Sequence, residues 1–353
     1  MGRGILAGLL LGLASAAAAA DAVDLTHLPL GDARKSSAPR AGYLWPCHVE
    51  PDAGGAFRDG PWIHADGTYD LNAKPVVSGS VRWPAHFSMT RDGDRRLFRT
   101  NDYPSHSTGT FPISHNDAAF QYDRNPNALS EQAMQVSLPA MPQLAAQPSC
   151  TPGAVGILLS GAVLFNALDA PGRDAVAHET QDRCQGHPQN SGVYHYHSLS
   201  SCLDDVVDAD GHSQLLGYAL DGFGIYGRHG EHGQLLTSAD LDECHGHTHR
   251  VVWDGQSVEM YHYHATWDFP YTVGCLRGNW SRRDVMTISG GPREPRRGPG
   301  GGDAPDLAAA AAKLGIQEEQ LRRALGPPPP NLDAAARQLG ISVDALRDAL
   351  RPR

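Results

Sequence analysis

Short stretches in which apolar and polar residues alternate run through the middle of the chain. Alternation with a period of two is typical of a half-buried β-strand, and helical periodicity is not obvious between residues 151 and 289. We predict strands in this region at Val155–Leu159, Ala162–Phe165, Val193–His197, Leu215–Leu220, Gly224–Tyr226, Val251–Trp253 and Val258–His264. The pattern therefore predicts a mainly β core over residues 151–289.

The segment 41–150 is rich in Gly, Pro, Asp and aromatic residues. Its short apolar runs, such as Pro75–Val77 and Val81–Trp83, are bounded by turn residues. That combination favours β-structure with long loops, so we interpret 41–150 as the N-terminal, β-rich part of the same domain. Residues 21–40 are polar and lack periodicity, which is typical of a linker.

Residues 1–20 have the pattern of a signal peptide. Arg3 supplies the positive charge, Ile5–Leu13 is the apolar run, and Ala18–Ala20 forms a small-residue cleavage site. The apolar run is too short to span a bilayer as an anchor, and we find no other stretch that could. We therefore expect an exported protein, periplasmic or secreted, with no membrane span after removal of the signal.

The C-terminal end has a different pattern. Residues 290–305 are rich in Gly, Pro and Arg and predict a flexible linker. Residues 306–353 then repeat one unit, with an N-cap residue, an Ala-rich helix, a Gly stop and a second short helix. Each unit is too short to be stable alone. We expect the two helical hairpins to pack together or to dock on a protein partner.

One tetrapeptide occurs twice, as Tyr194–His197 and as Tyr261–His264. On a strand the two histidines of each copy share one face and the two tyrosines share the other. Histidine is the commonest metal ligand and suits zinc, copper, nickel and iron. We predict a transition-metal site with three or four imidazoles, whose first-choice ligands are His195, His197, His262 and His264.

The two tetrapeptides belong to a longer internal repeat. Asp182–His187 matches Asp242–His247, so that a Cys-x-Gly-His sequence precedes each copy, and Gly161–Phe165 matches Gly222–Tyr226. Such a repeat suggests two β units related by a pseudo-two-fold axis. The histidines that end the two Cys-x-Gly-His sequences, His187 and His247, are the next candidate ligands.

The cysteines have two interpretations. Six are present, and an oxidising compartment favours disulfides. The repeat favours the pairs Cys184–Cys202 and Cys244–Cys275, which leaves Cys47–Cys150. The alternative is a Cys2His2 zinc centre, made by Cys184, His187, Cys244 and His247. Oxidation of exported thiols argues against this centre.

These motifs closely resemble the YHYH-domain proteins of bacteria. The resemblance is carried by Cys184–Pro188, Gly192–His197, Gly217–Gly227 and Pro270–Cys275, and it extends upstream to Asn101–Pro112. It covers roughly residues 75 to 290 and implies an exported domain. Asp102 and Ser160 stand where the family's Asn-Gly turns would have glycine and asparagine, so we expect those turns to differ here.

The metal and its surroundings follow from the residue types. An exported histidine site suits copper first and zinc second, for metal handling or for metal-dependent oxidation. Asp221 could add a carboxylate, and the motif tyrosines could orient the imidazoles; these are Tyr194, Tyr196, Tyr261 and Tyr263. The alternative is a metal-free Tyr/His hydrogen-bond network in a structural or surface-interaction module. We interpret His212 as incidental.

The net charge and the lack of known catalytic motifs argue against several classes of protein. The formal net charge of -10 argues against general nucleic-acid binding, which needs a basic surface. Nothing resembles a Gly-x-Ser-x-Gly elbow, a phosphate loop or a His-Glu-x-x-His helix. A serine hydrolase or a zincin is therefore not expected, and the sequence leaves open whether the protein is an enzyme.

Overall fold

The computed structural model of the 353-residue chain describes residues 23–49, 54–281, 286–288, 307–326 and 331–350. The predicted signal peptide (1–20) and the predicted linker (290–305) lie outside the described residues. No helix in the described part combines the length and the apolar character that a membrane crossing requires.

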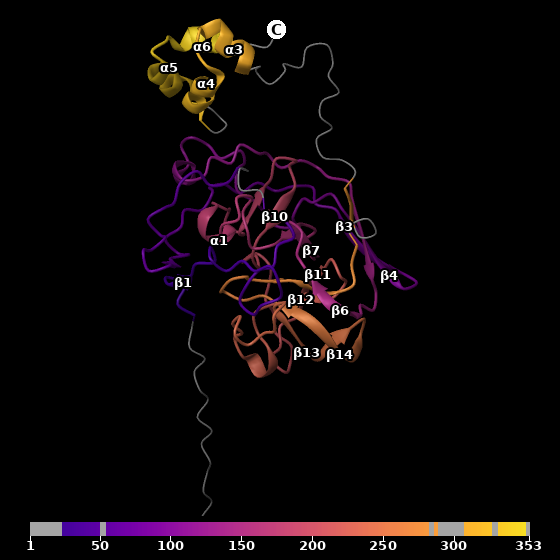
Figure 1. Cartoon of the computed structure of the whole chain (residues 1–353). Coiled ribbons are helices and arrows are strands. Elements are labelled where there is room, and N and C mark those ends of the chain that lie inside the picture. Colours follow the sequence, from indigo (N-terminus) through magenta and orange to yellow (C-terminus); the bar gives the residue numbers. More distant parts are fainter. Residues whose placement is uncertain (1–22, 50–53, 282–285, 289–306, 327–330, 351–353) are drawn as a thin grey trace, which may run out of the picture.

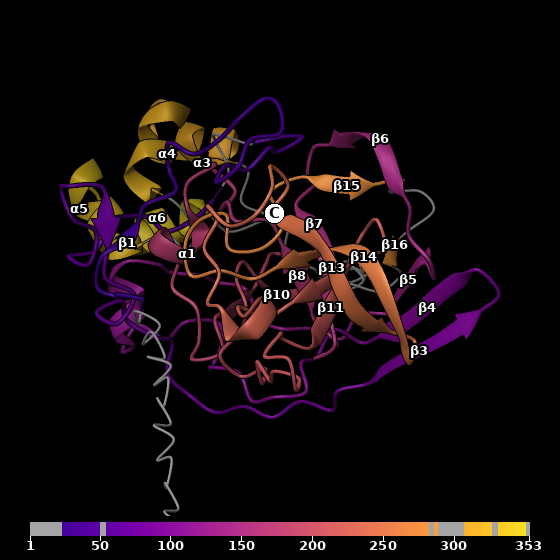
Figure 2. The same cartoon turned by 90° about the horizontal axis from the view of Figure 1, so that it is seen from below.

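The central element is an eight-stranded sheet with the order β13-β14-β12-β11-β7-β8-β10-β9. Figure 2 shows β13 and β14 as a long hairpin beside the shorter inner strands. The strands are β7 (Ala154–Leu158), β8 (Val163–Phe165), β9 (Gly186–Pro188), β10 (Tyr194–Tyr196), β11 (Leu215–Ala219), β12 (Gly224–Tyr226), β13 (Gly246–Trp253) and β14 (Gln256–His264). The prediction of a mainly β fold is confirmed.

The two halves of this sheet have the same topology. In each half an antiparallel pair (β7–β8 or β11–β12) is followed by a parallel neighbour (β10 or β14) and then by an antiparallel edge strand (β9 or β13). The register is also the same, because Tyr196 pairs with Leu164 and Tyr263 pairs with Ile225. The architecture agrees with the predicted duplication.

The halves meet at the antiparallel pair β7–β11. Gly156 and Gly217 allow this close approach, because a Cβ atom on either would lie 2.6 Å from a backbone carbonyl oxygen of the facing strand. The surrounding core is apolar and buried, with Ile157 and Ile225 each 1% exposed. Since the halves join through β7 and β11, the two Tyr-His-Tyr-His strands lie toward opposite ends of the sheet.

Three smaller sheets complete the β part (Figure 1). They contain β1 (Leu28–Pro29) with β2 (Thr68–Tyr69), β6 (Leu144–Ser149) with β15 (Leu276–Gly278), and the four strands β3 (Phe87–Asp92), β4 (Arg95–Thr100), β5 (Met134–Pro139) and β16 (Met286–Ile288). The helices within this part are short: η1 (Ala118–Gln121), α1 (Ala175–His178) and η2 (Glu231–Gly233). The apolar runs at Val77 and Val81 form isolated bridges rather than strands.

The tail forms two helical hairpins, as the sequence predicts. Its helices, yellow in Figure 1, are α3 (Leu307–Leu314), α4 (Glu318–Leu325), α5 (Leu332–Leu339) and α6 (Val343–Ala349). Asn331 and Ser342 cap α5 and α6 through side-chain oxygens that accept backbone N–H bonds. The hairpins pack on each other around the fully buried Leu321 and Leu346.

The disulfides are Cys47–Cys150, Cys184–Cys202 and Cys244–Cys275. All three predicted pairings are confirmed, and they fit an oxidising compartment. Each of the two local bridges closes a loop that contains one Tyr-His-Tyr-His strand. The alternative Cys2His2 zinc centre is wrong, because Cys184 and Cys244 are both engaged in disulfides.

Candidate metal centres

The first histidine cluster consists of His187, His195, His197 and Glu179. His195 on β10 pairs directly with His187 on β9, and Glu179 follows helix α1. The Nε2 atoms of His195 and His197 are 3.2 Å apart. One carboxylate oxygen of Glu179 lies 3.4 Å from Nε2 of His187 and 3.4 Å from Nε2 of His197.

The second histidine cluster consists of His212, His247, His262 and His264. His262 on β14 pairs directly with His247 on β13, and His212 comes from the loop before β11. Nε2 of His247 lies 3.0 Å from that of His262 and 3.1 Å from that of His264. Nε2 of His212 lies 3.2 Å from each of the same two atoms. Four ring nitrogens thus surround one point.

These spacings match those of ligand atoms around one metal ion. Ligand nitrogens at zinc lie about 2.0–2.1 Å from the ion, which places two tetrahedral ligands about 3.3 Å apart. Within each of the two histidine groups, all ligand atoms lie within 4.8 Å of one another. Each cluster therefore has the size of a mononuclear metal site.

Backbone carbonyls fix the ring orientation in both clusters. In the second cluster Nδ1 donates to a backbone carbonyl from His212 (to Ser213, 2.7 Å), His262 (to Met260, 3.0 Å) and His264 (to Gly227, 2.7 Å). In the first, His197 donates to Asn166 (2.6 Å) and His195 to Val193 (3.3 Å). A carbonyl oxygen only accepts, so Nδ1 carries the proton and Nε2 keeps a lone pair directed into the cluster.

Burial keeps these imidazoles neutral. Desolvation lowers the pKa of His197 to about 4 and that of His247 to about 4. It also lowers the pKa of His212 and holds the pKa values of the remaining ligands, His187, His195, His262 and His264, well below the ordinary range. Neutral imidazole is the form that binds a metal.

The pKa of Glu179 is shifted in the opposite direction to those of the histidines. Burial, followed by the nearby charges of Asp123 and Asp169, raises its pKa well above the usual carboxyl range. Without a cation this carboxyl group is therefore held protonated. A metal ion in the first cluster would reverse that balance, because a bound cation is the largest local charge in such a site.

The motif tyrosines point away from the cluster imidazoles, and three of the four donate to carboxylates. Tyr194 donates to Asp182 (2.9 Å), and Tyr261 donates to the equivalent Asp242 (3.0 Å). Tyr263 donates to Asp221 at 2.6 Å. The hydroxyl group of the fourth tyrosine, Tyr196, forms hydrogen bonds with Ser160 and His106. The expectation that these tyrosines and Asp221 surround the ligands is not supported, since their polar atoms are used on the opposite face of the strands.

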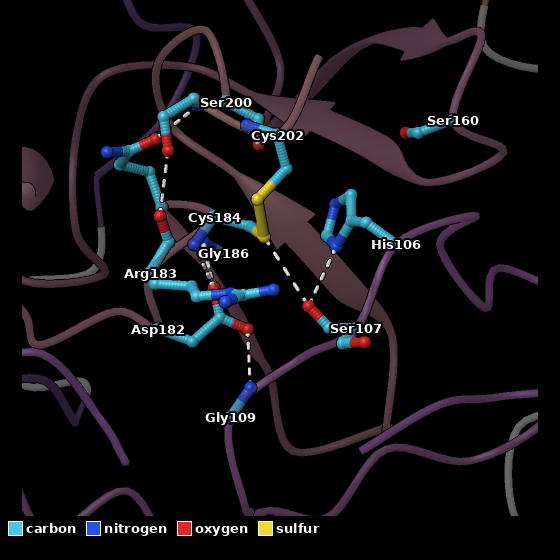
Figure 3. Close-up of a disulfide and its surroundings, with 12 residues drawn as sticks. His106, Ser107, Gly109, Ser160, Asp182, Arg183, Cys184, Gly186, Ser200 and Cys202 are labelled. Atoms are coloured by element: carbon cyan, nitrogen blue, oxygen red, sulfur yellow. Dashed lines mark hydrogen bonds between the residues drawn. A yellow bond between two sulfur atoms is a disulfide. The ribbon is translucent and has the colours of Figure 1, made fainter. Parts of the chain in front are cut away.

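Asp182 organises the turn before the first motif (Figure 3). Its carboxylate accepts from the backbone N–H of Gly109 and of Cys184, both at 2.9 Å or less. Asp242 accepts from Cys244 in the same way, at 2.9 Å. These bonds fix each Cys-x-Gly-His turn against its tyrosine, so the aspartate and tyrosine hold the histidine strands in place.

Asp102 occupies a turn position at which the sequence resemblance led us to expect glycine. It has φ 63°, the left-handed conformation that glycine adopts most readily. Its carboxylate accepts the backbone N–H of Tyr194 at 2.7 Å. Burial raises the pKa of this carboxyl well above its ordinary value. The turn therefore keeps a glycine-like conformation and gains a contact to the first motif.

The structure corrects the expectation that the two motifs share one ion. Strands β10 and β14 are separated by β8, β7, β11 and β12. At a spacing of about 4.8 Å between neighbouring strands, the motifs lie roughly 24 Å apart across the sheet. Each histidine pair instead meets the histidine of its own Cys-x-Gly-His turn. Two candidate centres replace the single predicted one.

Sequence reasoning missed the fourth member of each cluster. His212 was interpreted as incidental, but it is 3% exposed and belongs to the second cluster. Glu179 was not considered. Neither lies within a repeated motif, and the two come from unrelated positions in the two halves. Only the fold brings them to the imidazoles.

Comparison with known proteins gives one match. Residues 135–235 match the family model described as "YHYH protein". The matched segment contains the whole first cluster and His212, and it ends before β13. No curated protein and no solved structure matches the chain.

Proposed function

We propose that this chain, which is a YHYH-domain protein, binds two transition-metal ions outside the cytoplasm, one in each histidine cluster. The observation that carries the proposal is the second cluster, where four Nε2 atoms meet and three rings are fixed by Nδ1–H bonds to carbonyls. Lone pairs that meet in a desolvated pocket repel unless a cation lies between them. A metal ion supplies that cation.

Copper is our first choice of metal and zinc the second. The four short contacts of the second cluster form a closed ring in the order His212, His262, His247, His264. A square with such sides would place its ligands about 2.2 Å from the centre and a regular tetrahedron about 1.9 Å, which bracket the usual bond length. The ring thus accommodates the tetragonal geometry of copper(II) or the tetrahedral geometry of zinc.

The ligand number favours metal handling over metal-dependent oxidation. A catalytic ion keeps a coordination position open for water or substrate, whereas four protein ligands close the coordination shell. Each cluster offers four groups. We therefore propose that the protein stores, buffers or passes on metal in the periplasm or after secretion.

The metal-free network is less well supported. A hydrogen bond between two Nε2 atoms needs a proton on one of them, but the ring protons of His212, His262 and His264 are engaged with carbonyls. In the second cluster this leaves the single proton of His247 for four short Nε2 contacts, two of which do not involve His247. A second proton on a ring would require an imidazolium, which the lowered pKa values disfavour. Elemental analysis of untagged protein after dialysis against copper or zinc tests the proposal, with two ions per chain as the expected result.

A further inference from the structure

We infer that the two centres have different roles: the second cluster exchanges its ion with the solvent through His249 and Glu231, whereas the first cluster retains its ion. This inference rests on the proposed function, because it requires that both clusters bind metal. It goes further by assigning an access route to one of them. The two halves of the sheet share topology and register, but they differ in what lies beside their ligands.

An additional histidine stands next to the second cluster. His249 is two residues after His247 on β13, so both side chains lie on the same face of that strand. The His249 ring stacks on that of His212, with centroids 5.4 Å apart and an interplanar angle of 25°. Its centroid is 6.2 Å from that of His247. The His249 imidazole therefore lies next to two of the proposed ligands, His212 and His247.

The two nitrogens of His249 have different surroundings. Nε2 lies 3.2 Å from a carboxylate oxygen of Glu231, whose side chain is 48% exposed, while that of His249 is 19% exposed. Nδ1 is buried and has no hydrogen-bond partner among the described residues. When Nε2 carries the proton toward Glu231, Nδ1 holds a free lone pair. A buried imidazole nitrogen without a partner can receive a cation.

The exposure decreases in steps from Glu231 inward. Glu231 is exposed, His249 and His247 are both half-buried, and His262 and His264 are fully buried. An ion that leaves the buried pair can therefore pass to groups of increasing exposure that all carry suitable donor atoms. Carboxylate and imidazole both bind zinc and copper. This order of groups favours stepwise exchange over complete dehydration in one event.

The first cluster is more enclosed. Its three histidines are each 4% exposed or less, and the side chain of Glu179 is 12% exposed. The ring of Phe165 lies closer to His195, with centroids 4.0 Å apart, than the equivalent ring of Tyr226 lies to His262, with centroids 4.7 Å apart. Glu179 supplies a carboxylate that the second cluster lacks, with one oxygen 3.4 Å from Nε2 of His187 and of His197. Both features oppose release.

Chelator competition tests the inference. The full chain is loaded with zinc, its total zinc is measured, and it is then challenged with an excess of a chromogenic chelator whose absorbance changes when it binds the released zinc. We expect two bound ions and two release phases of equal amplitude. His264→Ala should remove the fast phase, and His195→Ala should remove the slow one. His249→Ala should slow the fast phase by about tenfold, the lower end of what groups beside a ligand set contribute to metal binding.

Two further variants complete the design. Glu231→Gln should slow the fast phase in the same direction as His249→Ala. His232→Ala is the matched control, because this neighbouring histidine is 81% exposed and belongs to neither cluster; it should leave both phases unchanged. Two ions released in a single phase, or a fast phase unaffected by His249→Ala, would overturn the inference and leave the proposed function intact. A chain that binds no zinc or copper would overturn both.

Discussion

His262 lies directly opposite His247 in the β13–β14 register, and the Nε2 atoms of the two rings are 3.0 Å apart. The equivalent residues of the other half, His195 and His187, face each other in the same register on β10 and β9. A histidine of the tetrapeptide and a histidine of the Cys-x-Gly-His turn thus form the nucleus of each centre. This pairing places the turn histidine beside the tetrapeptide histidine in each candidate centre.

The first prediction concerns pH. Protons compete with a metal only below the pKa of the ligand nitrogen, and burial lowers the pKa of His197 and His247 to about 4. We expect both ions to remain bound at about pH 5, where ordinary histidine sites with a pKa near 6.5 are protonated. Equilibrium dialysis over a pH series measures this. Release of both ions near pH 6.5 while circular dichroism still reports a folded chain would contradict it.

The same shifts predict how the stability of the metal-free chain depends on pH. The folded histidines have lowered pKa values, so the unfolded chain binds more protons between about pH 6.5 and pH 4. The contribution of these histidines to the free energy of unfolding should therefore fall as the pH falls through this window, so the wild type should lose more stability on acidification than the variant His262→Ala/His264→Ala. Urea titrations of both EDTA-treated proteins at several pH values measure the two slopes, and the carboxyl groups with raised pKa values contribute equally to both. Equal slopes for the two proteins are the contrary result.

The second prediction separates the tyrosines from the metal. Tyr263→Phe removes the hydroxyl that donates to the fully buried Asp221 at 2.6 Å and accepts from the backbone N–H of Arg277 at 2.7 Å. We expect a loss of about 1–3 kcal/mol in the free energy of unfolding, the cost of leaving buried polar groups without partners. Metal content should stay at two ions. Loss of an ion at unchanged stability would mean that Tyr263 acts on the metal.

The third prediction concerns the disulfide beside the first cluster. Replacing both Cys184 and Cys202 by serine opens the loop that contains β9 and β10. We expect a stability loss of about 2–4 kcal/mol, typical for the removal of such a cross-link, together with weaker metal binding at the first cluster. The second cluster should be unaffected, because its strands are closed by Cys244–Cys275. Chelator competition with each cluster mutated in turn assigns the effect, and equal weakening at both centres would refute it.

The fourth prediction is that metal stabilises the fold. An ion that binds the folded chain alone stabilises it by about 2.7 kcal/mol at a free concentration of 100 times the dissociation constant. Copper or zinc should therefore raise the melting temperature of the EDTA-treated protein, and magnesium should not, because it prefers oxygen ligands. Differential scanning calorimetry decides this. An equal response to all three ions would indicate a nonspecific salt effect.

Much of the fold could be predicted because its signals are local. The two-residue period of Tyr194–His197 predicts a strand with both histidines on one face, and the repeat predicts the pairs Cys184–Cys202 and Cys244–Cys275. Strand β9 was missed because Gly186–Pro188 is too short and too rich in Gly and Pro to show a period. The hairpin β3–β4 was missed as well, although Gly93-Asp94, the two-residue loop between its strands, is a recognised signal.

The arrangement of the site depends on information that is not local. A repeat indicates two similar units but not which strands join them. Here β7 and β11 form the junction, which places the histidine strands far apart and gives two candidate sites in place of one. His212 and Glu179 enter through loops that differ between the halves. The carboxylate partners of the tyrosines were likewise invisible, except that Asp182 and Asp242 occupy matching positions in the repeat.

Metal stoichiometry of paired variants tests the central claim most directly. Untagged wild-type protein, the double variant His195→Ala/His197→Ala and the double variant His262→Ala/His264→Ala are dialysed against copper or zinc, and bound metal per chain is measured by elemental analysis. We predict two ions for the wild type and one ion for each double variant, with circular dichroism confirming that all three are folded. Substoichiometric metal in the wild type, with no change in either folded variant, would contradict the assignment of the two histidine clusters as metal centres.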